Sequence, residues 1–144
     1  MSIRIEHRIG VAAPPHRVWE VIADLDRWPE WNPHNPEVTG RIAFGGSLDV
    51  VEALQGEPAR RAQVLISDWT PDIQLVWDDK RGLMAKSRRY FELEPLGDGE
   101  ACILANGEIF EGWRGEDWAA ARRQKLRAAY EAVNQAIKSR VETA

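Results

Sequence analysis

Polar and aromatic residues alternate in two segments of the chain in a way that suits acid–base or ligand-binding chemistry. Arg89 lies two positions before Phe91, and Asn106, Glu108 and Phe110 alternate in a later segment. Successive side chains of a β-strand point to opposite faces, so each series is expected to share one face. A guanidinium, an amide and a carboxyl group that face one space can hold a ligand's oxygen atoms or exchange a proton with it.

A structural interpretation of the same residues stays open beside the functional one. A charge in a partly dry cavity is costly unless it is paired. Arg89 and Glu108 on neighbouring strands can supply each other's partner, as a plain ion pair, or can lie at exposed strand ends. We therefore expect either a polar anchor for a ligand or an ion pair within the fold.

The seven tryptophans form a second group of candidates. Trp28 and Trp31 follow Trp19 closely, and Trp77 belongs to an alternating series with Ile73 and Leu75. Large aromatic side chains with one polar N–H suit a core that borders a cavity. Trp28, Trp31 and Trp77 are thus candidates for ligand contact, with core packing as the alternative.

Other chemistry finds less support in the spacing. Glu52 is the one polar member of an alternating apolar series, and we expect it near a solvated mouth. His16 and Glu20 lie four apart on a helix, but a third metal ligand is missing and their face is expected to be solvated, so we expect no metal. Cys102 has no visible activator. The glycine pair at 45–46 lacks a nucleotide-binding pattern, and no cofactor is expected.

The overall composition limits the classes of partner. The chain has 144 residues, a formal charge of −4 and a single cysteine. It has no basic stripe to neutralise phosphates, so nucleic acid is not an expected partner. No run of about 18 apolar residues or secretory leader is present, so we expect no membrane insertion and a cytoplasmic location.

The periodicity of apolar residues predicts the elements that position these candidates. A helix follows the proline pair at 14–15 and runs to about residue 24, and a second, short one covers 28–31. A long helix over 116–142 has an apolar stripe of Ala119, Leu126, Tyr130, Val133, Ile137 and Val141. Alternation and turn residues predict seven strands, at 3–11, 38–44, 48–55, 60–69, 73–79, 84–94 and 101–110.

The arrangement of these elements follows from the short connections and the helical stripe. Connections this short join antiparallel strands, so the last six strands form a meander. The stripe of the long helix must pack on something apolar, and the sheet is the only surface large enough. The predicted class is α+β, with a bent antiparallel sheet around a C-terminal helix in one domain, residues 1–144.

Four segments resemble a known group of proteins. Residues 11–24 (VAAPPHRVWEVIAD) and 28–33 (WPEWNP) are similar to the opening of the polyketide cyclase/dehydrase and lipid-transport group, within the START/Bet v 1-like (SRPBCC) superfamily. Residues 91–99 and 108–112 resemble that group's sixth and seventh strands. The resemblance covers nearly the whole chain. It implies the helix-grip fold: a seven-stranded curved antiparallel sheet around a long C-terminal helix, with two short helices between strands 1 and 2.

The resemblance implies an internal pocket but not one activity, because one fold hosts many functions. Its first implication is binding or transport of a small hydrophobic, lipid-like or aromatic ligand between the sheet and the last helix. A cyclase or aromatase, with Arg89, Glu108 and Asn106 orienting an enol, is the second. A module that binds a protein partner is the third. The residues expected to line the pocket are Trp28, Trp31, Trp77, Arg89, Phe91, Asn106, Glu108 and Phe110.

Overall fold

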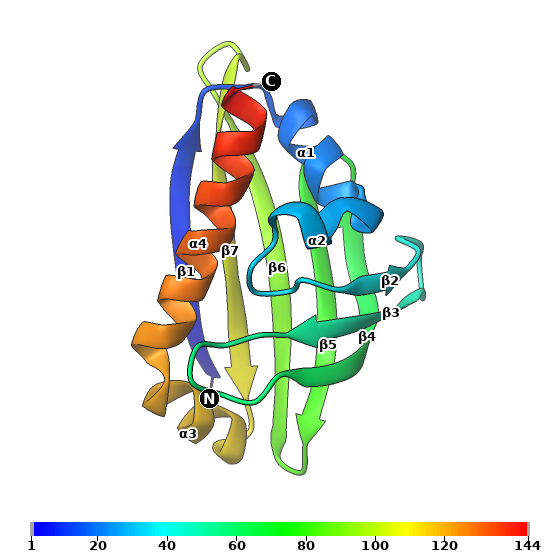
Figure 1. Ribbon diagram of the computed structural model, residues 1–144, viewed down its shortest axis with the longest axis vertical. Coiled ribbons are helices and arrows are strands. Elements are labelled where there is room, and N and C mark those ends of the chain that lie inside the picture. The colour runs from blue at the N-terminus through cyan, green and yellow to red at the C-terminus, as the bar shows by residue number, and fades with distance from the viewer. Residues whose placement is uncertain (1, 144) are drawn as a thin grey trace.

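A curved antiparallel sheet of seven strands dominates the computed structural model, which describes residues 2–143 (Figure 1). The strand order is β1-β7-β6-β5-β4-β3-β2, and every neighbouring pair is antiparallel, as the short connections predict. The strands are β1 (Ser2–Val11), β2 (Val38–Gly40), β3 (Ser47–Glu52), β4 (Arg60–Thr70), β5 (Gln74–Gly82), β6 (Ala85–Leu96) and β7 (Ala101–Glu111).

Five helical segments accompany the sheet. They are α1 (Pro15–Ala23), the 3-10 turn η1 (Leu25–Arg27), α2 (Trp28–Trp31), α3 (Trp113–Ala121) and α4 (Arg123–Glu142). The prediction of one unbroken helix over 116–142 is wrong, because the backbone leaves helical geometry at Arg122. The Arg122 side chain donates to the Trp118 carbonyl and to Glu57, which fixes the bend.

Several strand boundaries also differ from the prediction, and one difference matters for the site. β3 ends at Glu52, so the predicted strand at 48–55 is too long. β2 ends at Gly40, whose φ of 133° leaves the extended conformation, so the predicted strand at 38–44 is too long. β5 continues to Gly82 beyond the predicted end at residue 79. Arg81, read from the sequence as part of a turn, is therefore a strand residue on the same face as Trp77 and Asp79.

The helix α4 lies along the sheet and crosses β1 and β7, with α1 and α2 beside it (Figure 1). All six residues of the predicted apolar stripe are buried, which confirms its orientation. The buried apolar residues form two clusters. One contains Trp28, Trp77 and Phe91, and the other contains Phe110 and Tyr130. Within residues 2–143, no helix has the combined length and apolar character needed to cross a membrane.

Candidate functional site

A group of buried polar side chains lies where the two apolar clusters meet, and we call it the polar centre. On β7, for example, Asn106 and Glu108 separate Leu104 of the first cluster from Phe110 of the second. The polar centre comprises His34, Glu52, Arg60, Asp79, Arg81, Ser87, Arg89, Asn106 and Glu108. Buried charges are costly unless they are paired, so the partners of each group decide what it can do.

Arg81 is the central cation of this group. Its guanidinium donates to Glu52 at 2.8 and 3.0 Å and to Glu108 at 3.2 Å. Arg60 also contacts Glu52, at 3.2 Å, and pairs with Asp79. Burial alone would raise the pKa of Glu52, but Arg81 and Arg60 outweigh it and lower that pKa to about 2. The predicted position of Glu52 near a solvated mouth is wrong, because Arg81 holds it inside, 7% exposed.

Glu108 has three hydrogen-bond donors around its carboxyl group. The Tyr130 hydroxyl donates to it at 2.8 Å, Ser87 donates to its second oxygen, and Arg81 pairs with it. Burial is the largest influence and raises the pKa of Glu108. The ion pair between Glu108 and Arg89 that the sequence analysis considered does not form. Glu108 pairs with Arg81 instead, and the Arg89 guanidinium donates to Asn106.

Among the arginines of the polar centre, Arg89 stands out because two of its guanidinium nitrogens are buried without an acceptor among the residues described. Its Nη1 donates to Asn106, to the Tyr90 carbonyl at 3.1 Å and to the Gly107 carbonyl at 3.0 Å. Its Nε and Nη2 have no acceptor among residues 2–143, although the residue is only 2% exposed. A buried donor without an acceptor costs about 1–3 kcal/mol, so this geometry calls for an explanation.

Arg89 lines a small cavity. Its volume is about 10 Å³, which is room for one water molecule. It is lined by His34, Asn35, Val50, Glu52, Arg60, Trp77, Asp79, Arg89 and Glu108. This differs from the expected apolar pocket, because the cavity is small and most of the side chains that line it are charged or polar. Any larger group that reaches Arg89 must move a neighbouring side chain.

His34 closes one side of this cavity, and its loop is shaped by local hydrogen bonds. The Asn32 side-chain oxygen accepts from the backbone N–H of His34 at 3.1 Å and of Asn35 at 2.8 Å. The His34 Nδ1 lies 3.1 Å from the Ala53 carbonyl, and its ring packs edge-on against Tyr130. Burial lowers the pKa of His34 to about 4, so the ring is neutral at pH 7 and its Nε2 is an acceptor.

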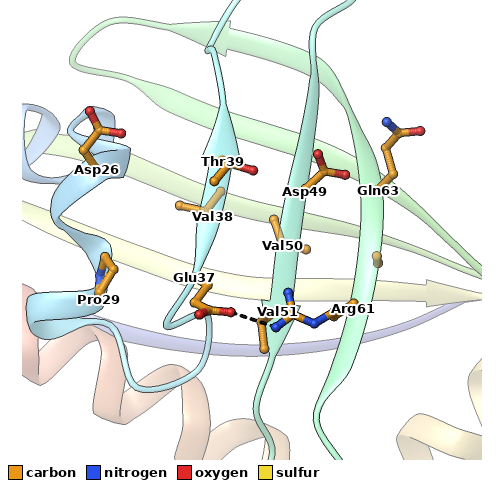
Figure 2. Close-up of a pocket in the computed structure, with 11 residues that line it drawn as sticks. Asp26, Pro29, Glu37, Val38, Thr39, Asp49, Val50, Val51, Arg61 and Gln63 are labelled. Atoms are coloured by element: carbon orange, nitrogen blue, oxygen red, sulfur yellow. Dashed lines mark hydrogen bonds and ion pairs between the residues drawn. The ribbon is translucent and has the colours of Figure 1, made fainter.

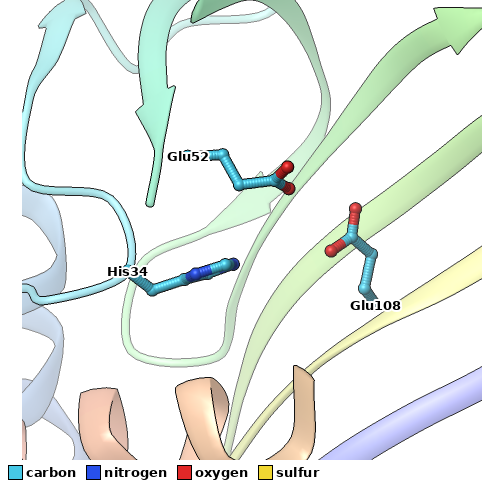
Figure 3. A group of neighbouring side chains, drawn as sticks. All are labelled: His34, Glu52 and Glu108. Atoms are coloured by element: carbon cyan, nitrogen blue, oxygen red, sulfur yellow. The ribbon is translucent and has the colours of Figure 1, made fainter. Parts of the chain in front are cut away.

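His34, Glu52 and Glu108 point toward one another (Figure 3). Their ligand atoms all lie within 4.8 Å of one another, which is close enough to share a metal ion. However, Arg81 donates to both carboxylates, so a cation would have to compete with a guanidinium. The unpartnered Arg89 donors also favour an oxygen-bearing ligand over a cation. The pair weighed from the sequence, His16 and Glu20, does not belong to this group.

The sequence-predicted site residues fall into three places. Arg89, Asn106 and Glu108 come together in the polar centre, as their shared strand face predicts. Phe91 and Trp77 border it, with ring centroids 4.7 and 5.9 Å from the Arg89 guanidinium carbon.

The other predicted residues are Trp28, Trp31 and Phe110. The two tryptophans pack away from the polar centre, whereas the Phe110 ring borders it, with its centroid 5.5 Å from the Arg81 guanidinium carbon. Trp28 is fully buried against Trp77 and Phe91, and its indole N–H donates to the Ile22 carbonyl at 3.1 Å. Trp31 packs on Trp28 at 5.7 Å. We call Trp28, Trp31, Trp77 and Phe91 the aromatic cluster. Phe110 lies in the second apolar cluster, beside Trp118 at 5.8 Å.

Sequence reasoning missed several members of the site, namely His34, Arg60, Asp79, Arg81 and Tyr130. Asp79 and Arg81 continue the alternation of Trp77. Asp79 already lies within the predicted strand at 73–79, and a longer strand would have included Arg81 as well. The helical period identifies Tyr130 only as a member of the apolar stripe, although its hydroxyl donates a hydrogen bond to Glu108. His34 lies in a loop with no period, so nothing in the sequence pattern pointed to it.

Four larger hollows lie outside the polar centre among the residues described, and two of them share a lining residue with the cavity at Arg89. One, of about 700 Å³, lies between Pro29 and strands β2 to β4 (Figure 2). The ion pair of Glu37 and Arg61 at 3.2 Å lies at its rim, and both side chains are exposed. The other, of about 430 Å³, lies between residues 53–59 and α4, and His34 lines it as well as the cavity. The first hollow shares the lining residue Val50 with Arg89's cavity, and the second groove shares His34 with it.

Three solved structures resemble this fold over almost its full length. StfQ, a di-domain ARO/CYC from the steffimycin biosynthetic pathway, matches with a TM-score of 0.78 and 16% identity over 99% of this chain. The chain spans 51% of StfQ. The Zhui aromatase/cyclase from Streptomyces sp. R1128 matches with a TM-score of 0.74 and 20% identity, covering 99% of this chain and 94% of Zhui. A START superfamily protein from Mycobacterium smegmatis matches at 0.76 and 17%, covering 97% of both chains.

At these identities the structural likeness shows the fold alone, and a comparison with curated proteins finds no match. Sequence evidence for the family comes from a family pattern described as "Polyketide cyclase / dehydrase and lipid transport", which matches residues 2–142. That match spans both the polar centre and the helix that covers it. The chain belongs to the polyketide cyclase/dehydrase and lipid transport family.

Proposed function

We propose that this protein binds a small molecule with an apolar carbon body and an oxygen-bearing head, and that Arg89 binds the head. The observation that carries the proposal is the buried Arg89 guanidinium, with Nε and Nη2 unpartnered beside a cavity. The rings of Phe91 and Tyr130 lie 4.7 and 4.8 Å from its central carbon. These rings hold the guanidinium in place, so a ligand oxygen would meet a preorganised donor pair.

The charges of the polar centre define which head groups fit. Three carboxyl groups, of Glu52, Asp79 and Glu108, face three guanidinium groups, of Arg60, Arg81 and Arg89. With all six ionised the set is neutral, and a carbonyl or hydroxyl oxygen binds without a change of charge. With a proton on Glu108, whose pKa burial raises, the set gains one positive charge and suits an oxyanion such as a carboxylate or enolate.

A pair of matched arginine variants tests the proposal. Arg89→Met removes the donors, whereas Arg88→Met removes the neighbouring arginine on the outer face, where it is 58% exposed. Calorimetric titration with 2-naphthoate and with naphthalene compares a ligand that has an oxygen head with one that lacks it. We expect Arg89→Met to weaken 2-naphthoate binding about 10- to 100-fold, since hydrogen bonds to charged groups contribute about 1.5–3 kcal/mol. Equal effects of the two variants, or equal binding of the two compounds, would overturn it.

A second candidate function is catalysis of proton transfer next to a carbonyl group, the chemistry a cyclase or aromatase needs. Glu108 lines the same cavity as Arg89, and its raised pKa brings it toward the range of an effective general base at neutral pH. Its carboxylate would take a proton from the carbon beside the carbonyl. The C–H electrons would form the C=C bond, and the carbonyl oxygen, held by Arg89, would become the enolate oxygen. The aromatase/cyclase names of StfQ and Zhui support this candidate.

Deuterium exchange distinguishes the enzyme from a carrier. The methyl protons of 2-acetylnaphthalene, followed by NMR in D₂O, should exchange faster with the protein than with buffer alone. Glu108→Gln keeps the shape of the side chain but removes the base, so the acceleration should disappear. A protein that binds 2-acetylnaphthalene through Arg89 without accelerating exchange would be a carrier.

A further inference from the structure

The groove between residues 53–59 and α4 is the outer neighbour of the polar centre. Figure 1 shows the connection from β3 to β4 reaching across to the first half of α4. The groove's volume, about 430 Å³, is far larger than the cavity at Arg89. His34 lines both spaces, so its side chain forms the wall that separates them.

The walls of this groove are made largely of small apolar side chains. On α4 they are Ala128, Ala129 and Ala132, and on the opposite side Pro33 and Leu54 contribute. Short alanine side chains leave a smooth wall against which a flat ring or an alkyl chain can pack, with a gain of about 25 cal/mol per Å² of apolar surface removed from water. The groove therefore suits the carbon body of a ligand.

The contacts that close the groove toward the inside are few. The His34 ring is fastened to the connection through the Ala53 carbonyl, 3.1 Å from Nδ1. The connection is fastened to α4 through Glu57, which pairs with Arg122 at 3.0 Å and with Lys125 at 3.1 Å. Partly exposed ion pairs of this kind contribute little to stability, so they oppose a small displacement of the connection only weakly.

We propose that the ligand's carbon body occupies this groove while its oxygen-bearing end passes His34 to reach Arg89. This inference rests on the proposed function and adds the ligand's shape. The ligand is an elongated molecule with a flat or narrow apolar body and one terminal oxygen group, rather than a compact molecule enclosed within the sheet. His34 is then a positioning residue that moves aside on binding.

Filling the groove tests this arrangement. Ala132 lines the groove and its side chain is exposed, so Ala132→Trp occupies the space without entering the core. Ala120→Trp makes the same change at an exposed alanine of α3 that does not line the groove. With 2-naphthoate as the ligand, Ala132→Trp should weaken binding about tenfold or more, and Ala120→Trp should leave it within about twofold.

Further measurements keep the outcomes distinct. Ala128→Trp is the second groove-filling variant if Ala132→Trp fails to fold by circular dichroism. His34→Ala removes the wall and should speed the association of 2-naphthoate in stopped-flow fluorescence. Binding that depends on Arg89 but not on the groove variants or His34 would overturn the groove and leave the proposed function standing. Absence of 2-naphthoate binding to the unaltered protein, or binding that ignores Arg89, would overturn both.

Discussion

The aromatic cluster and the polar centre share one face of the sheet, but they differ in how completely their buried polar atoms are hydrogen-bonded. In the aromatic cluster, Trp28 is fully buried and its one polar atom donates to the Ile22 carbonyl. In the polar centre, Arg89 is nearly as buried, yet two of its three nitrogens have no acceptor among the residues described. The two regions lie only a few residues apart along β6. The same strand therefore contributes to apolar packing at one point and to the polar centre at another.

The two buried arginines of the polar centre show the same difference on a smaller scale. Arg81 pairs with Glu52 and Glu108, and these carboxylates raise its pKa. Arg89 lacks an ion pair of this kind, and burial lowers its pKa. We infer that Arg81 maintains the fold and that Arg89 is reserved for a ligand. Variants of the two regions test this inference, because their effects on the free energy of unfolding can be measured separately from their effects on ligand binding.

The largest expected effect is on the aromatic cluster. Trp28→Ala should lower the free energy of unfolding by about 4 kcal/mol, because the large cavity it leaves cannot collapse fully. Packing carries no charge, so the loss should be the same at pH 5 and pH 7. Urea denaturation at both pH values measures it. A loss that changes with pH would mean that the two regions are coupled.

Arg81→Met should come next, with a loss of about 3 kcal/mol. Removing one partner of a buried ion pair leaves the other charge uncompensated, here on Glu52 and Glu108. Urea denaturation again measures the change, with Arg88→Met as the exposed control. If Arg81→Met were as mild as Arg88→Met, the polar centre would not depend on Arg81.

The pH dependence of stability isolates His34. Its folded pKa of about 4 lies below the usual 6.5, so between these values the unfolded chain binds more protons and stability rises with pH. Lowering the pH from 7 to 5 should therefore reduce the free energy of unfolding by about 2 kcal/mol through His34. His34→Gln should lack this part of the dependence. Parallel pH curves for both proteins, measured by urea denaturation, would show that His34 is not buried as a neutral ring.

The smallest effect is expected at the connection of residues 53–59. Glu57→Gln removes the ion pairs to Arg122 and Lys125, which are partly exposed, so the free energy of unfolding should hardly change. Amide hydrogen exchange in the connection should nevertheless become faster. Glu37→Gln, which breaks an exposed pair with Arg61 elsewhere, is the control and should leave exchange at 53–59 unaltered. Unchanged exchange in Glu57→Gln would show that Glu57 does not fasten the connection.

The sequence was informative about the fold where a periodic pattern was long. The stripe of α4 and the alternation of β6 and β7 predicted which side chains point inward, including Arg89 and Glu108, because a period of two or of 3.6 depends only on backbone geometry. The break at Arg122 escaped prediction, since it depends on contacts with Glu57 that are distant in sequence.

The details of the site were harder to predict for the same reason. Which carboxylate pairs with which arginine is decided by side chains on different strands, and Arg81 competes successfully for Glu108 against Arg89. His34 enters the site through a loop held by Asn32, where no periodic signal exists. The polarity of the interior likewise depends on a β5 strand that ends three residues later than predicted, which brings Arg81 inside.

A crystal structure of the protein with bound 2-naphthoate tests most directly whether Arg89 binds the oxygen-bearing head of a ligand. We expect a carboxylate oxygen of 2-naphthoate about 2.7–2.9 Å from Nε or Nη2 of Arg89, the distance typical of charge-assisted hydrogen bonds. Arg81 should keep its contacts with Glu52 and Glu108. A compound bound elsewhere, with no ligand oxygen within hydrogen-bond distance of Arg89, would contradict it.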